Sequence, residues 1–267
     1  MKEIPPTNRV SFSTEKRPDG SEETILCFNI PEAWTALDDR ELREIYRLKT
    51  KVKGTDFALR AFLILTSGEL LRREPHFSLF TFRTQRGYVI RSIKPRFLIP
   101  MLEKLKFLET PGDDPVRVDE LHKCKAADRK LHGFPFSEWI RIEQAWQAFL
   151  KIRDRSILER IAASLYPVAG GHLAEWEAIN IIGWMAALKA MFTREFPNFY
   201  RPAGSTDGDP MSMRQQMDVQ IRALTGGDVT KERQVLATDV WRALTELDAK
   251  AKEAADIKRE RSKTTRR

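Results

Sequence analysis

The chain has 267 residues, of which 42% are hydrophobic and 31% charged, a composition typical of a soluble globular protein with one or two domains. Its formal net charge is +8, but residues 250–267 hold eight Lys/Arg against three acids and so carry +5 of it. The basic character is mainly a property of this end, and a nucleic-acid-binding body would need a basic face as well.

Cysteine content and hydropathy indicate the compartment. Two cysteines, Cys27 and Cys124, are too few for a disulfide framework, so we expect a reducing compartment, the cytoplasm. The first 20 residues have no apolar core, so no signal peptide is expected. The sequence contains no run of about 18 apolar residues, so no membrane span is expected either.

The first half of the chain predicts an arm followed by an α+β region. Residues 1–23 are polar and contain three prolines, so we expect a flexible N-terminal arm. Residues 24–120 form the α+β region, in which the apolar run 57–65 predicts a buried helix. Alternating residues around Gln85-Arg86-Gly87 predict a β-hairpin, and we expect a short strand at 116–118.

The second half, residues 121–257, is predicted to be helical. Apolar residues at helical spacing indicate helices from Phe136 to Ile152, from Ser156 to Leu165 and from Leu173 to Phe196. The predicted fold is therefore mainly α with a small antiparallel β element, an α+β class.

The helical half is predicted to end in an αα-hairpin. The first helix has an apolar stripe through Met217 and Ile221, and Gly226-Gly227 ends it. Asp228 or Thr230 begins the second helix, whose stripe contains Leu236, Val240, Leu244, Leu247 and Ala251. A connection this short favours two antiparallel helices, with a basic tail, residues 258–267, after them.

The hairpin is the candidate interaction surface. Trp241 lies beside the predicted seam, where an aromatic side chain either anchors a partner or packs in the core. The interface hypothesis assigns five residues: Met217, Ile221, Val240, Trp241 and Leu244.

The basic tail has two interpretations. It is either a solvated, frayed helix end that the helix dipole favours, or a segment that touches nucleic acid. The second interpretation assigns six residues: Lys258, Arg259, Arg261, Lys263, Arg266 and Arg267. We favour the first, because the tail has no interleaved aromatic residues, and we expect any nucleic-acid binding to be weak.

The sequence offers no strong catalytic or metal-binding signal. His122, Cys124 and His132 form a partial cluster, but a structural zinc site needs four ligands, usually from two close pairs. The sequence also has no nucleophile elbow, phosphate loop or dinucleotide fingerprint. We therefore predict no enzyme activity, no catalytic residue, no metal and no cofactor. An unrecognised enzyme ranks third, after the assembly protein and the DNA-associated protein described below.

Several segments resemble a known group of proteins. The stretches Lys125–Trp139 (KAADRKLHGFPFSEW), Phe192–Ala203 (FTREFPNFYRPA) and Met213–Glu253 resemble uncharacterised proteins of Bacteroidota phages and prophages. The early segment LCFNIPEAWTALDDRELREIYRL is similar to the opening of phage tail assembly and virion morphogenesis proteins.

The resemblance implies a setting rather than a chemistry. It implies a tail or virion morphogenesis protein that acts in the host cytoplasm during assembly, whether or not it stays in the virion. The expected partners are other phage structural or assembly proteins or a second copy of the chain, without a membrane. The alternative is a DNA-associated phage protein that uses the basic tail.

Overall fold

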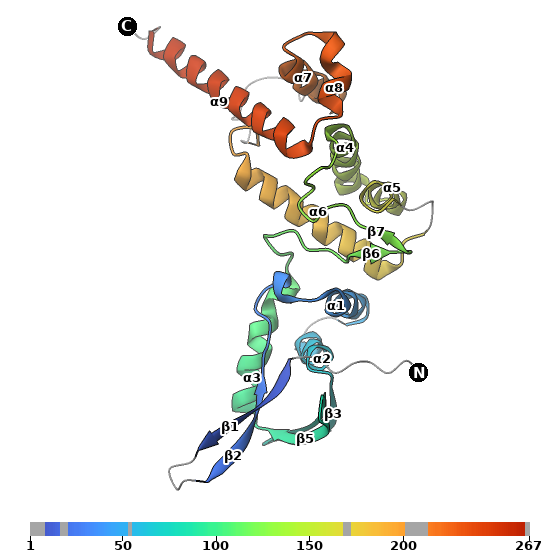
Figure 1. Ribbon diagram of the computed structural model, residues 1–267, viewed down its shortest axis with the longest axis vertical. Coiled ribbons are helices and arrows are strands. Elements are labelled where there is room, and N and C mark those ends of the chain that lie inside the picture. The colour runs from blue at the N-terminus through green and yellow to red at the C-terminus, as the bar shows by residue number, and fades with distance from the viewer. Residues whose placement is uncertain (1–8, 17–20, 53–54, 168–171, 201–212, 265–267) are drawn as a thin grey trace. The chain divides into compact units, whose positions relative to one another are not determined.

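The computed structural model describes residues 9–16, 21–52, 55–167, 172–200 and 213–264. The chain is 58% helical and has small antiparallel sheets, which confirms the predicted α+β class. It divides into two compact units, Met1–Gly112 and Asp113–Arg267 (Figure 1). This division falls slightly before the expected one, which separated residues 24–120 from 121–257.

Unit 1 contains the larger share of β structure. Its described elements are β1 (Val10–Lys16), β2 (Glu22–Phe28), η1 (Trp34–Ala36), α1 (Asp39–Lys51), α2 (Thr55–Leu65), β3 (Gly68–Arg73), β4 (Ser78–Thr84), β5 (Gly87–Ile93), α3 (Pro95–Lys104) and η2 (Leu105–Glu109).

The core of unit 1 lies between α2 and the three-stranded sheet β3–β4–β5. Phe80 and Phe82 of β4 are fully buried, with ring centroids 6.1 and 6.2 Å from that of Phe62 in α2. Strands β4 and β5 pair antiparallel from Ser78–Ile93 to Thr84–Gly87, which confirms the predicted hairpin. Its two-residue turn is Gln85-Arg86.

The expected flexible arm is wrong for residues 10–16. These residues form β1, which pairs antiparallel with β2 from Val10–Phe28 to Lys16–Glu22. Beside it, the Arg9 guanidinium donates to both carboxylate oxygens of Glu41 in α1, at 2.9 and 2.8 Å. The polar composition concealed a strand whose backbone groups are satisfied by pairing with the next segment of the chain, β2. Residues 1–8 and 17–20 lie outside the described residues.

Unit 2 is mainly helical. Its described elements are β6 (Glu120–Leu121), β7 (Cys124–Lys125), α4 (Phe136–Ile152), α5 (Arg155–Leu165), α6 (Glu175–Glu195), α7 (Met213–Thr225), η3 (Val229–Lys231), α8 (Glu232–Leu236) and α9 (Val240–Thr264). The three helices predicted between Phe136 and Phe196 are confirmed as α4, α5 and α6.

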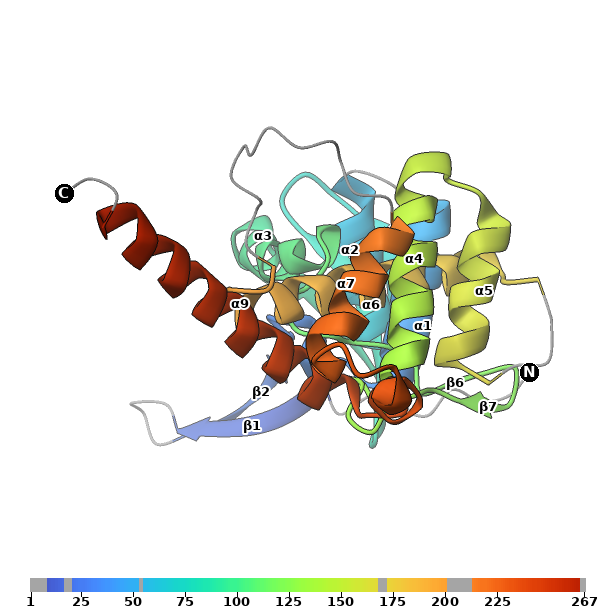
Figure 2. The same cartoon turned by 90° about the horizontal axis from the view of Figure 1, so that it is seen from above.

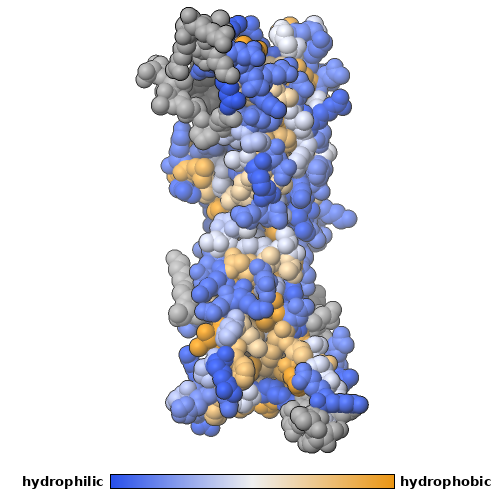
Figure 3. All heavy atoms as spheres, turned by 90° about the vertical axis from the view of Figure 1, so that its left-hand side faces the viewer, coloured by the Kyte–Doolittle hydropathy of each residue, from blue (hydrophilic) through white to orange (hydrophobic). Residues whose placement is uncertain are grey.

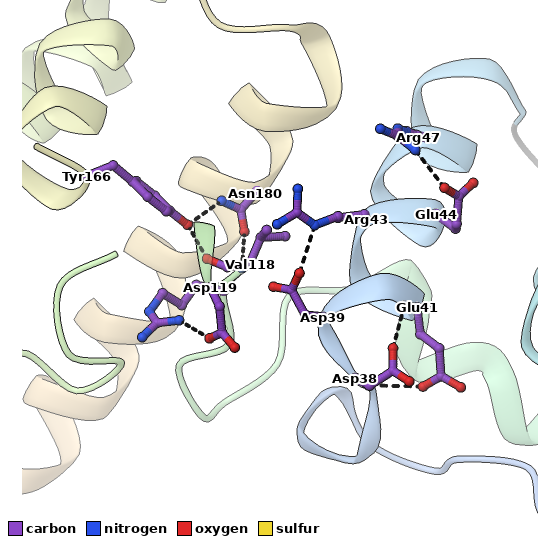
Figure 4. A network of polar contacts seen from close by, with 11 residues as sticks. Asp38, Asp39, Glu41, Arg43, Glu44, Arg47, Val118, Asp119, Tyr166 and Asn180 are labelled. Atoms are coloured by element: carbon purple, nitrogen blue, oxygen red, sulfur yellow. Dashed lines mark hydrogen bonds and ion pairs between the residues drawn. The ribbon is translucent and has the colours of Figure 1, made fainter. Parts of the chain in front are cut away.

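The strand expected at 116–118 is wrong, because side chains satisfy the backbone there. The Val118 N–H donates to Asn180 Oδ1 at 3.0 Å, and the Tyr166 hydroxyl donates to the Val118 carbonyl at 2.6 Å (Figure 4). Asn180 Nδ2 in turn donates to the Tyr166 hydroxyl at 3.1 Å. This buried network joins α6 to the end of α5 and replaces the expected strand ladder.

The C-terminal hairpin is present, but its second arm is interrupted. Helices α7 and α9 are in contact, and Gly226 and Gly227 have φ of 65° and 87°, as the predicted helix stop requires. The single helix expected from Asp228 or Thr230 is wrong. It divides into η3, α8 and a new helix, α9, that begins at Val240.

Candidate functional site

Helix α9 begins at a point fixed by a loop more than a hundred residues earlier. Asp239 Oδ1 accepts hydrogen bonds from the backbone N–H groups of Trp241 (2.9 Å) and Arg242 (3.3 Å), so it caps the helix. Its other oxygen accepts from the Gly133 N–H. On either side, the Val240 N–H donates to the Phe134 carbonyl at 2.9 Å, and Phe136 N–H donates to the Thr238 carbonyl at 2.8 Å.

Trp241 packs inside unit 2. Its indole N–H donates to the Lys130 carbonyl at 2.7 Å, and its ring stacks on His132 with centroids 4.7 Å apart. The edges of Phe192 and Phe196 meet the same ring, each with centroids 5.5 Å away. Trp241 is half-buried, so it joins α6, α9 and the loop before α4 while part of its surface stays accessible.

A second contact attaches α9 to the end of α6. Asp248 Oδ1 accepts from the backbone N–H groups of Asn198 (2.7 Å) and Phe199 (2.9 Å), and Oδ2 accepts from Asn198 Nδ2 at 2.9 Å. Burial by itself raises the pKa of the Asp248 carboxyl, but the Asn198 and Phe199 donors outweigh it. The pKa of Asp248 therefore lies below its ordinary value.

These contacts bring together three of the four segments on which the expected resemblance was based. Asp239 and Trp241 touch the first segment, and Asp248 touches the second, residues 192–203, through its described part. Sequence reasoning missed Asp239 and Asp248. Thr238-Asp239 before an apolar helix was an available N-cap signal; the partner of Asp248 had no local signal.

The structure places the predicted interface residues mostly inside unit 2. Val240 and Leu244 are 0% and 1% exposed, and Ile221 of α7 is 9% exposed. Met217 belongs to α7, but its side chain lies outside the described residues. Their assignment to a partner interface stays a prediction, in which Trp241 offers the accessible surface.

The C-terminal part of helix α9 extends away from the rest of unit 2 (Figures 1 and 2). Most side chains of residues 249–261 are exposed, and Ile257 is 52% exposed. The predicted tail cations Lys258, Arg259 and Arg261 lie on this exposed end. The side chain of Lys263 and residues Arg266 and Arg267 lie outside the described residues.

Unit 2 also contains a cavity of about 490 Å³ beside α5. His122 lies at its rim and meets Glu177 at 3.1 Å, and His172 meets Glu159 at 3.0 Å. The side chain of Glu177 also accepts from the Ala174 N–H at 2.7 Å. The lining is otherwise largely apolar, with the buried Tyr166 among its residues.

The residues of the partial metal motif separate in the structure. His122 pairs with Glu177, His132 stacks on Trp241, and Cys124 Sγ lies 3.7 Å from the His122 carbonyl. In the part of the chain that the structure describes, no three His, Cys, Asp or Glu side chains are grouped to hold a metal ion. Within the same residues, no helix is long and apolar enough to cross a membrane.

Comparison of the chain with protein-family models, with curated proteins and with solved structures finds no match.

Proposed function

We propose that this chain is a non-enzymatic assembly protein of phage tail or virion morphogenesis that works through protein–protein contacts. The setting rests on the resemblance, which spans most of residues 26–255. The mode of action rests on one observation: α9 is attached at Asp239 and Asp248, while its remaining length is exposed.

The geometry of α9 supports a docking role. Its 25 residues span about 37 Å at 1.5 Å per residue, and the first third is held by unit 2. A short helix is marginally stable alone in water, but one that continues from a fixed first turn avoids the cost of nucleation. The exposed part, residues 249–261, therefore offers a partner an ordered surface at low entropic cost.

Truncation tests the docking role. A chain that ends at Lys250 loses nearly all of the exposed part of α9, whereas one that ends at Ile257 keeps residues 249–257 of it and loses the basic tail. We expect the second to enter assembly intermediates of the encoding phage and the first to be excluded from them, as measured by sedimentation and immunoblotting. Equal entry of both truncated chains would refute the docking role.

Deletion of the gene tests the setting. We expect electron microscopy of the lysate to show tailless heads or tails of wrong length. Normal infectious particles would contradict the proposal.

The DNA-associated alternative is favoured by the exposed cations Lys258, Arg259 and Arg261 at the end of α9. It predicts that the chain ending at Ile257 already loses function. It also predicts a block before particle assembly, seen as reduced phage DNA synthesis in the deletion strain.

A further inference from the structure

One face of the sheet β3–β4–β5 in unit 1 is open to solvent. Side chains alternate across a strand, so the burial of Phe80 and Phe82 toward α2 turns Thr81 and Arg83 to the opposite face. Tyr88 pairs with Arg83 and Ile90 with Thr81, and directly paired residues share a face. By the same rule Glu69 of β3, which pairs with Thr81, and Leu79, which pairs with Ser92, lie on this face. We call the face formed by Glu69, Leu79, Thr81, Arg83, Tyr88, Ile90 and Ser92 the outer sheet face.

The outer sheet face exposes an aromatic ring. Tyr88 is 74% exposed and Ile90 is 56% exposed. The described aromatic contacts to the sheet, from Phe62 of α2 and Phe28 of β2, reach Phe82 on the other face. In Figure 1, α2 lies on one side of β3 and β5, and the described ribbon leaves their other side uncovered. A phenol ring on an open sheet face is a platform on which a planar group can stack.

The segment of the chain around Tyr88 is strongly basic, although the exposed Glu69 of β3 adds one acid to the outer sheet face. Residues 83–106 contain a single acid, Glu103, which pairs with Lys106 at 3.6 Å. The same interval contains seven cationic residues: Arg83, Arg86, Arg91, Lys94, Arg96, Lys104 and Lys106. Because the chain outside the C-terminal end carries only +3, this interval is a local excess of positive charge.

Other hydrophobic surface in unit 1 lies near these cations. Phe97 and Ile99 of α3 are each 54% exposed, and the Arg96 guanidinium lies 4.7 Å from the Phe97 ring centroid. Figure 3 shows hydrophobic residues gathered on one face of unit 1, with hydrophilic residues around them. The Arg86 guanidinium lies 5.5 Å from the ring of Phe12 in β1. Cations and aromatic rings are thus interleaved in this unit, whereas the C-terminal tail has cations without aromatic rings.

We propose that the outer sheet face binds single-stranded nucleic acid. Tyr88 stacks on a base, and the exposed Arg86, Arg91 and Lys94 contact the phosphates that follow along β5 and its exit. Arg91 pairs with Phe80 and so starts from the opposite face, but it is exposed on the edge strand β5, so its phosphate contact lies at the β5 edge rather than on the outer sheet face. The charge favours a polyanion, and the exposed ring favours a strand whose bases are unstacked from a duplex. This site is independent of the assembly role and of the C-terminal tail.

Fluorescence anisotropy of the full chain with labelled 15-nucleotide oligo(dT) and oligo(rU) tests the proposal. We expect binding that weakens with salt, with a log–log slope of about −2 for three phosphate contacts. Tyr88→Ala should weaken binding about fivefold to a hundredfold without changing this slope. Tyr88→Trp keeps an aromatic ring at this position and should bind as tightly as the unsubstituted chain. Arg91→Gln should reduce the slope by about 0.7.

Matched controls separate the site from general charge. Arg141→Gln removes the same charge from an exposed position of α4 in unit 2 and should leave binding unchanged. A chain ending at Ile257 should retain most of the affinity, because the outer sheet face remains. Thermal unfolding of the Tyr88 variants should match that of the unsubstituted chain, because Tyr88 is exposed.

Several results would overturn the proposal. Absence of binding to both oligonucleotides would do so, and so would unchanged binding in both Tyr88→Ala and Arg91→Gln. Loss of all binding in the chain ending at Ile257 would assign oligonucleotide binding to the C-terminal tail instead of the outer sheet face. Equal affinity for a 15-base-pair duplex, insensitive to Tyr88→Ala, would also refute base stacking.

Discussion

The Asp248 carboxylate in α9 binds both nitrogens of Asn198, which lies just beyond the end of α6. The backbone N–H is 2.7 Å from Oδ1, and the side-chain Nδ2 is 2.9 Å from Oδ2. A carboxylate that accepts two donors from one residue fixes both the position and the orientation of that residue. This pair therefore determines where α9 leaves the rest of unit 2.

We predict that Asp248→Ala lowers the free energy of unfolding by about 1–3 kcal/mol, because it leaves the Asn198 donors without their charged acceptor. Urea unfolding at pH 7 measures the change. Glu253→Ala, which removes an acid from an exposed position of the same helix, is the matched control and should have a much smaller effect. Equal effects of the two substitutions would contradict the assigned role.

The same pair predicts a dependence on acid. Because the pKa of Asp248 is lowered in the folded chain, its stabilisation is complete above the ordinary carboxyl pKa of about 3.9. It is lost as pH falls through the lowered value. The stability difference between the unsubstituted chain and Asp248→Asn should therefore shrink below about pH 4, as measured by urea unfolding over a pH series. A difference that grows on acidification would show the sign to be wrong.

We predict that Trp241→Ala destabilises the fold as well as any partner contact. Removing the ring takes away its contacts with His132, Phe192 and Phe196. For this half-buried ring we expect about 2 kcal/mol, less than the roughly 3–5 kcal/mol typical of fully buried tryptophans. Trp241→Phe keeps much of the ring contact but loses the bond to the Lys130 carbonyl, so its effect should be smaller. Chemical unfolding of both variants measures this order, and no loss in either would refute it.

The β6–β7 turn predicts a stabilising substitution. His122 and Lys123 both have left-handed backbone conformations, with φ of 49° and 66°, which glycine adopts without steric cost. We expect Lys123→Gly to raise the free energy of unfolding by about 0.5 kcal/mol. The reason is that the backbone strain relieved at this left-handed position exceeds the extra conformational entropy that glycine loses on folding. Differential scanning calorimetry measures this change. Lys125→Gly, in the adjoining strand β7, should destabilise instead; a loss of stability in Lys123→Gly would contradict the prediction.

The close approach of Gly68 to Phe82 predicts a steric effect. A Cβ added at Gly68 would lie 2.8 Å from the ring carbons of Phe82, a side chain that is fully buried. Gly68→Ala should therefore lower the free energy of unfolding by about 1–3 kcal/mol. In Gly68→Ala with Phe82→Leu, the smaller side chain should offset part of this loss. A strictly additive double-mutant cycle would show that the two residues do not interact.

Local patterns in the sequence predicted much of the fold. The apolar spacing predicted α4, α5 and α6, and alternation around Gln85-Arg86-Gly87 predicted the β4–β5 hairpin. Both patterns depend on residues within a few positions of one another, because a helix face repeats about every 3.6 residues and a strand face every two. The Gly226-Gly227 stop was predictable for the same reason.

Partners outside the local pattern decided what the sequence alone did not predict. Residues 10–16 form a strand because β2, the next segment of the chain, satisfies their backbone groups. Residues 116–118 form none, because the distant Asn180 and Tyr166 satisfy the backbone groups of Val118. The predicted second arm of the C-terminal hairpin is interrupted before Val240, because Asp239 binds both the first turn of α9 and the distant Gly133. Propensity and periodicity are local quantities, whereas a buried polar group takes its partner wherever the folded chain brings one.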